Sequence, residues 1–142
     1  MAISNQLLFK LAGGVISWQS HAQKTVALSS TEAEYMAISD CSKQAIWIKA
    51  LLLEIGIQLK SIPIYGDNQG SIFIASNPVQ ESRTKHINIW YHFIHDLISA
   101  KEVELMFVPR EMNPTDMFTK NLAKVKFTIF QEELSLDFES TK

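Results

Sequence analysis

The sequence contains a single cysteine and no excess of basic residues, and each of these absences excludes a class of protein. With Cys41 alone, no disulfide can form within the chain, so the sequence favours a reducing intracellular compartment, the cytoplasm or the nucleus. Thirteen Lys and Arg stand against fifteen Asp and Glu, a net charge of -2. A chain this balanced cannot bind polyanions through a basic tail, because counterion release needs clustered cations. Any contact with nucleic acid must therefore come from a local site or a bound metal.

Long apolar runs are also absent. The longest, AIWIKALLLEIGI, is interrupted by Lys49 and Glu54, so we expect no membrane-spanning segment. Apolar residues make up 46% of the 142 residues and charged residues 20%, which is ordinary globular composition. We expect residues 1–122 to form one domain and residues 123–142 to form a helical extension with a charged tail.

Strand and helix signals alternate along the chain. Gly13-Gly14 is typical of a tight hairpin between strands at 5–11 and 14–20. Ser29 and Glu32 form a capping-box pattern that predicts the start of a long helix, and Gly56 marks its end. The other expected strands lie at 24–28, 62–65 and 103–108, and the other expected helices at 69–76, 87–100, 115–122 and 123–142, with a loop at 80–86. This order predicts an α/β fold with a mixed sheet flanked by helices.

Three acidic residues occupy positions where a carboxylate has a candidate role beyond that of a solvated surface charge. Glu34 continues the apolar seam of the long helix, so it either faces the sheet and needs a cation or donor, or favours the helix dipole in water. Asp67 follows the strand at 62–65, where α/β proteins gather their sites, but it also suits an Asx-turn or a helix N-cap. Asp116 lies in the first turn of an expected helix, where a surface aspartate is equally favoured. Taken singly, none of the three defines a site.

Other reactive side chains are interpreted as structural. His92 and His95 are three residues apart on an expected helix, and His86 lies on the turn before it. No cysteine lies near them, so a polar helix face is favoured over a zinc site. Cys41 falls within the apolar seam of the long helix, which is typical of a small core residue.

Three separated runs resemble one protein family in order and spacing. They are TVALSSTEAEYMAISDCSKQAIWIKALLLEIG, IYGDNQGSIFIASNPVQESRTKHINIWYHFI and VPREMNPTDMFTKNL. Together they resemble the ribonuclease H domain of copia-type retrotransposon Pol polyproteins, from about Leu8 to Leu122. The resemblance implies a five-stranded mixed sheet flanked by helices and cleavage of the RNA strand of RNA–DNA hybrids. It also implies a two-metal site in which Glu34, Asp67 and Asp116 are catalytic residues and magnesium ligands.

The same resemblance places a basic cluster, Arg83, Lys85 and His86, in a loop where it would contact a phosphate backbone. The alternative is that these are the ordinary cations of a polar loop. We interpret the cluster as a candidate nucleic-acid-binding site for an RNA–DNA hybrid.

The sequence departs from the family at its first metal ligand. The family has four carboxylates, and the first lies on its first, central strand. No Asp or Glu precedes Glu32 here, so that ligand and that strand have no counterpart. We therefore expect a weak or incomplete magnesium site, impaired cleavage, and open sheet edges that permit self-association. Two alternatives stay open: an active hybrid nuclease completed by another segment or chain, and a non-catalytic domain that binds nucleic acid or protein.

Overall fold

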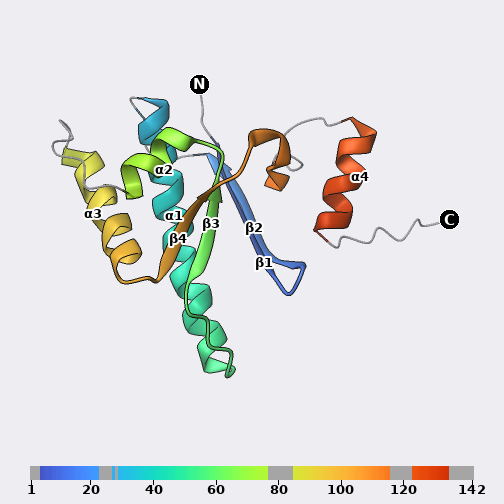
Figure 1. Cartoon of the computed structure of the whole chain (residues 1–142), viewed down its shortest axis with the longest axis horizontal. Coiled ribbons are helices and arrows are strands. Elements are labelled where there is room, and N and C mark those ends of the chain that lie inside the picture. Colours follow the sequence, from blue (N-terminus) through green and yellow to red (C-terminus); the bar gives the residue numbers. More distant parts are fainter. Residues whose placement is uncertain (1–3, 23–26, 28, 77–84, 116–122, 135–142) are drawn as a thin grey trace. The chain divides into compact units, whose positions relative to one another are not determined.

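The computed structural model describes residues 4–22, 27, 29–76, 85–115 and 123–134. Contacts divide the chain into two compact units. Figure 1 labels the helices and strands of the chain. Unit 1 comprises residues 1–24 and 112–142, and unit 2 comprises residues 25–111. The fold is α/β, as the sequence predicts. The domain boundary expected after residue 122 stays a prediction.

Unit 2 is built around two parallel strands, β3 (Ile62–Gly66) and β4 (Val103–Phe107). Their register runs from Ile62 opposite Val103 to Gly66 opposite Phe107. Parallel neighbours need a long crossover connection, and here the connection carries α2 (Gln69–Ser76) and α3 (Lys85–Ser99). A short 3-10 helix, η1 (Arg110–Met112), follows β4. Because the strands are parallel, the residues that follow β3 and β4 emerge at the same edge of the sheet.

The long helix α1 (Ser30–Glu54) precedes β3, and its ends follow the signals in the sequence. Ser29 is the N-cap, and its Oγ accepts a hydrogen bond of 3.1 Å from the backbone N–H of Glu32. The helix ends just before Gly56, whose φ of +87° is the left-handed conformation that glycine adopts at low cost. The predicted start and end of this helix are therefore confirmed.

The core of unit 2 lies where α1 meets α3. Tyr35, Ile38 and Ile94 are buried together, with the rings of Tyr91 and Phe93 packed against them. Figure 1 shows α1, α2 and α3 beside the strand pair, and α1 and α3 contact β3 and β4 respectively. The N-terminal half of α1 is buried on most of its circumference, so Glu34 is held in a packed region rather than at a frayed end.

Unit 1 contains an antiparallel hairpin and a helix. Strands β1 (Ser4–Leu11) and β2 (Gly14–Ala22) pair with a register shift between Phe9 and Lys10. The hairpin turn uses positive φ values at Ala12 and Gly13, as a tight hairpin requires. The helix is α4 (Lys124–Glu133), and the Lys10 Nζ donates to the Glu133 carbonyl at 2.6 Å.

The structure differs from the sequence-based expectation in two places. The sequence predicts one mixed sheet, whereas the described residues form two separate two-stranded sheets, since none of their strands pairs with both the hairpin and β3. In addition, Lys85 and His86 begin α3 rather than ending a loop. The strand expected at 24–28, the helix expected at 115–122, and residues Arg83 and Asp116 fall wholly or mostly outside the described residues. Within the described part of the chain, no helix combines the length and apolarity needed to cross a membrane.

Candidate functional site

Two of the three predicted carboxylates lie close enough in unit 2 to act on each other. Glu34 lies in the second turn of α1, and Asp67 directly follows β3, the strand that α1 packs against. The pKa of Glu34 is raised, first by burial and second by the negative charge of Asp67, while the positive charge of Arg110 lowers it. A raised pKa means that the folded protein holds the Glu34 proton more tightly than water-exposed glutamate does. The pair thus forms a partly buried acidic site at the carboxyl end of β3.

Arg110 is the third charged member of this site. Its Nε lies 3.4 Å from Oδ2 of Asp67, and its side chain is 73% exposed whereas that of Asp67 is 20% exposed. Sequence reasoning missed Arg110, because its position beside Asp67 follows from strand pairing. The register of β3 and β4 places Phe107 beside Gly66, so residues shortly after Phe107 must lie near Asp67.

Asn68, not Asp67, caps the helix that follows β3. The backbone N–H of Ser71 donates to Oδ1 of Asn68 at 3.0 Å, which is the N-cap bond of α2. The capping role that was one interpretation of Asp67 therefore belongs to its neighbour. The Asp67 carboxylate lies beside Arg110 instead.

The remaining predicted site residues are not placed by the structure. Asp116 and Arg83 lie outside the described residues, and the side chains of Lys85 and His86, in the first turn of α3, are not described. Among the described residues, no three of His, Cys, Asp and Glu gather as a metal-binding group. What the described part of the chain supplies is a pair of carboxylates, Glu34 and Asp67.

The side chains interpreted as structural have structural surroundings. The ring of Tyr91 makes an edge contact with His92 at 5.6 Å and stacks on His95 at 5.7 Å between ring centroids. Burial raises the pKa of the Cys41 thiol to about 12, and the neighbouring charge of Asp40 adds to this. A thiol with that pKa stays protonated at neutral pH and is a poor nucleophile.

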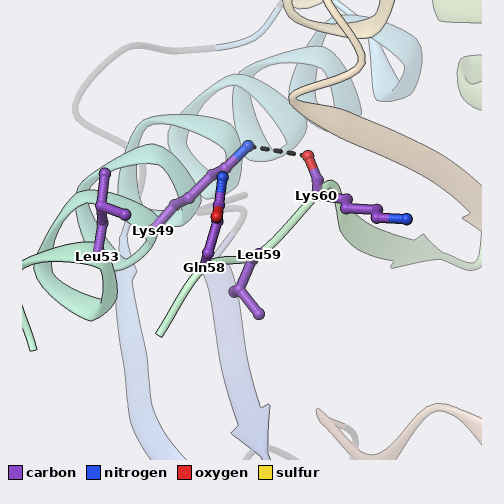
Figure 2. A pocket seen from close by; sticks show the side chains of 5 residues that line it. All are labelled: Lys49, Leu53, Gln58, Leu59 and Lys60. Carbon is purple, nitrogen blue, oxygen red and sulfur yellow. Dashed lines mark hydrogen bonds between the residues drawn. The ribbon is translucent and has the colours of Figure 1, made fainter. Parts of the chain in front are cut away.

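A small pocket lies toward the other end of α1, some fifteen residues or about 22 Å along the helix from Glu34. Figure 2 shows the pocket, whose volume is about 250 Å³ and whose lining is Lys49, Leu53, Gln58, Leu59 and Lys60. The Lys49 Nζ donates to the carbonyl oxygen of Lys60 at 3.0 Å and to Oε2 of Glu102 at 2.6 Å. These bonds tie the end of α1 to the segments before β3 and β4. Among the described residues, this lining holds no carboxylate, histidine or thiol.

The fold and the site define an α/β unit with two coupled carboxylates at the carboxyl end of a parallel strand, beside an arginine. Neither a protein-family profile nor a solved structure matches the chain. The comparison with curated sequences does identify relatives. The chain is 40% identical, over 129 residues, to the retrovirus-related Pol polyprotein from transposon TNT 1-94 of Nicotiana tabacum. That match covers 91% of this chain and 10% of the tobacco protein.

Two further relatives come from Arabidopsis thaliana, the retrovirus-related Pol polyproteins from transposons RE2 and RE1. They are 39% and 38% identical over 134 residues, covering 94% of this chain and 9% of each relative. The chain therefore spans about a tenth of the length of the curated relatives it matches. This chain is similar over most of its length to one segment of the Pol polyproteins of plant transposons, which supports an origin in a retrotransposon.

Proposed function

We propose that this chain is a ribonuclease H-like domain of a retrotransposon Pol polyprotein, with impaired cleavage of the RNA strand of RNA–DNA hybrids. The observation that carries the proposal is the coupled pair of carboxylates at the carboxyl end of β3, formed by Glu34 and Asp67. Similarity to Pol polyproteins over 91% of the chain supports the same origin. Hydrolysis adds one water across a phosphodiester bond, leaving a phosphate on one fragment and a hydroxyl on the other.

The donor set of this site suits magnesium. Carboxylate oxygens are the hard ligands that magnesium prefers, and Glu34 and Asp67 would hold one ion together with water, with Asp116 as a proposed third ligand. A bound ion of this kind makes a coordinated water more acidic and stabilises charge on the leaving oxygen. The burial of Glu34 adds to the fit, because a partly desolvated carboxylate gains more from a nearby cation than one in bulk water.

Three features weaken the site in this chain. Arg110 lies 3.4 Å from the Asp67 carboxylate and offsets its charge where a cation would bind. The sequence also has no Asp or Glu before Glu32, so no residue of its first 31 can act as a carboxylate ligand. Glu34 must moreover lose its proton before it can ligate, and its raised pKa makes metal affinity fall as pH falls. We therefore expect weak binding of one ion rather than a tight two-ion site.

Contact with the hybrid is proposed for Arg83, Lys85 and His86, near the start of α3. With so few cations, affinity would be low and would fall steeply as salt concentration rises. Replacing Arg83 and Lys85 with alanine should reduce both the affinity and its salt dependence. An unchanged salt dependence in this double variant would contradict their role.

The test is hydrolysis of a labelled RNA strand, paired with DNA, by the purified 142-residue protein in millimolar magnesium. We expect slow cleavage that Glu34→Gln abolishes and that EDTA abolishes. Glu104→Gln serves as the matched control, since Glu104 is an exposed carboxylate on β4. Fast cleavage that depends on Glu34 would contradict the impairment and support the active nuclease. Cleavage that persists unchanged in Glu34→Gln would contradict the assigned site.

A second measurement separates metal binding from catalysis. Millimolar magnesium should raise the melting temperature of the wild type but not of Glu34→Gln. Removing the competing charge with Arg110→Gln should increase the effect of magnesium. If magnesium leaves the wild-type melting temperature unchanged at every pH above neutrality, the metal site proposed here is wrong.

A further inference from the structure

The C-terminal half of α1 and the C-cap residue that follows it carry an exposed apolar stripe. Trp47, Leu51 and Ile55 recur every four residues, and their exposed fractions are 66%, 48% and 67%. The residues that directly follow Trp47 and Leu51, which are Ile48 and Leu52, are buried and anchor the helix. We call Trp47, Leu51 and Ile55 the outer stripe of α1. Scattered apolar residues are normal on a surface, but a contiguous row on one helix face is typical of an interaction site.

The charges beside the outer stripe indicate what kind of partner it fits. Lys43 and Glu54 are eleven residues apart, about three full turns, so they lie on the same side of the stripe at its opposite ends. The Lys43 Nζ contacts the Asp40 carboxylate at 3.2 Å, and both side chains are exposed. Exposed pairs of this kind contribute little, so the Lys43 head can reach a second carboxylate.

These positions are self-complementary in one orientation only. When two identical helices pair antiparallel, flanks on the same side of the stripe meet across the interface. A two-fold axis midway between Trp47 and Leu51 places each of these residues opposite the other in the second copy. The same axis brings Lys43 beside Glu54 of the second copy, with its aliphatic stem over Ile55. In a parallel pair, the side of the stripe that carries Lys43 and Glu54 would face the opposite side of the second copy, so the two charges would not meet across the interface.

We propose that the outer stripe of α1 is a self-association surface, through which two copies of this chain pair with their α1 helices antiparallel. The contact is isologous, so it closes as a dimer and does not propagate into filaments. A single helix face buries less than about 1,200 Å² in total, so the dimer is weak and forms in the micromolar range. This proposal is independent of the proposed nuclease function, because it uses none of the residues of the carboxylate site.

Sedimentation velocity of the full 142-residue protein over a range of concentrations tests the proposal. The wild type should show a reversible monomer–dimer equilibrium, and Leu51→Glu should weaken it by at least about tenfold, because the charge would be buried in the contact. Val125→Glu is the matched control, since Val125 is 74% exposed on α4 and should leave the equilibrium unchanged. Circular dichroism of each variant confirms that the fold is kept.

Charge exchange tests the antiparallel geometry itself. Lys43→Glu and Glu54→Lys should each weaken the dimer about two- to fivefold, and the double exchange should restore it. A monomer at every concentration would overturn the proposal and leave the stripe to another partner. A dimer that Leu51→Glu does not weaken would overturn it in favour of another surface, such as the edge of β3 that pairs with no strand among the described residues. Failure of the double exchange to restore the dimer would overturn the antiparallel arrangement.

Discussion

Replacing Glu34 with glutamine should stabilise the protein at neutral pH and leave its stability unchanged in acid. Burial and the charge of Asp67 raise the pKa of Glu34 in the folded state. Between the pKa of the unfolded state and the higher pKa of the folded state, the folded protein binds more protons than the unfolded one. The free energy of unfolding therefore falls as pH rises through that window, and the loss is complete above it. Glutamine keeps the shape of the side chain and carries no charge, so it avoids this loss.

The size of the effect follows from the same linkage. Each unit between the two pKa values corresponds to about 1.4 kcal/mol of free energy of unfolding. Because Arg110 offsets part of the repulsion, we expect the gain from Glu34→Gln at about pH 7 to lie at the low end of the range typical of single substitutions, about 0.5–1 kcal/mol. For a chain of this size that is up to about 3 °C in melting temperature. Below about pH 4, where glutamate is protonated in both states, the gain should vanish.

Thermal unfolding followed by circular dichroism, in EDTA and across this pH range, measures the difference. Glu104→Gln is the control, and as a surface substitution it should stay within about 0.5 kcal/mol of the wild type at each pH. Two results would refute the reasoning. A gain of equal size in acid and at neutral pH would show that the effect does not come from ionisation. A loss of stability at neutral pH would show that the ionised Glu34 has a favourable partner in the folded state.

Asp67→Asn should lower the pKa of Glu34, because it removes a repelling charge, and Arg110→Gln should raise it, because it removes an attracting one. NMR titration of carboxyl-labelled glutamate measures both pKa changes. Changes in the opposite sense would show that the groups are not coupled. Asn68→Ala should reduce the free energy of unfolding by about 1 kcal/mol, because the first turn of α2 loses its cap. Urea denaturation measures this free energy, and no loss would mean that the cap is dispensable. Ile94→Ala should cost about 2–5 kcal/mol, because this fully buried side chain lies in the core cluster of unit 2; a loss below about 1 kcal/mol in the same assay would place the core elsewhere.

Elements with strong local signals could be predicted from the sequence. The capping pattern at Ser29 and the glycine at position 56 bound α1 within a residue or two, because both act through the backbone next to them. The hairpin in unit 1 follows from Gly13 for the same reason, although its turn is Ala12-Gly13 and Gly14 already begins β2. The start of α3 was misplaced, since Lys85 and His86 have no distinct local cue and the helix extends through them.

The residues of the candidate site likewise divide into those that local sequence patterns identify and one that only tertiary contacts reveal. Periodicity places Glu34 on the buried seam of α1, and position after a strand places Asp67 at a sheet edge, so both were identifiable as candidates. Neither pattern measures how close they lie. Arg110 was missed because its proximity to Asp67 arises from the pairing of β3 with β4, two strands separated by both helices of the crossover.

The sequence by itself determined the local structure of this protein and its α/β class, because helix caps and turns act over a few neighbouring positions. It also determined the similarity to the Pol polyproteins of plant transposons, because that similarity is carried by runs of residues in the same order and spacing. Only the tertiary structure decided which charges meet. It assigned the cap of α2 to Asn68, brought Arg110 to Asp67, and raised the pKa of Glu34 by burying it beside a second carboxylate. The reason is that burial and Coulomb interaction depend on distance in space, and in this fold that distance is fixed by strand pairing and helix packing between segments far apart in the chain.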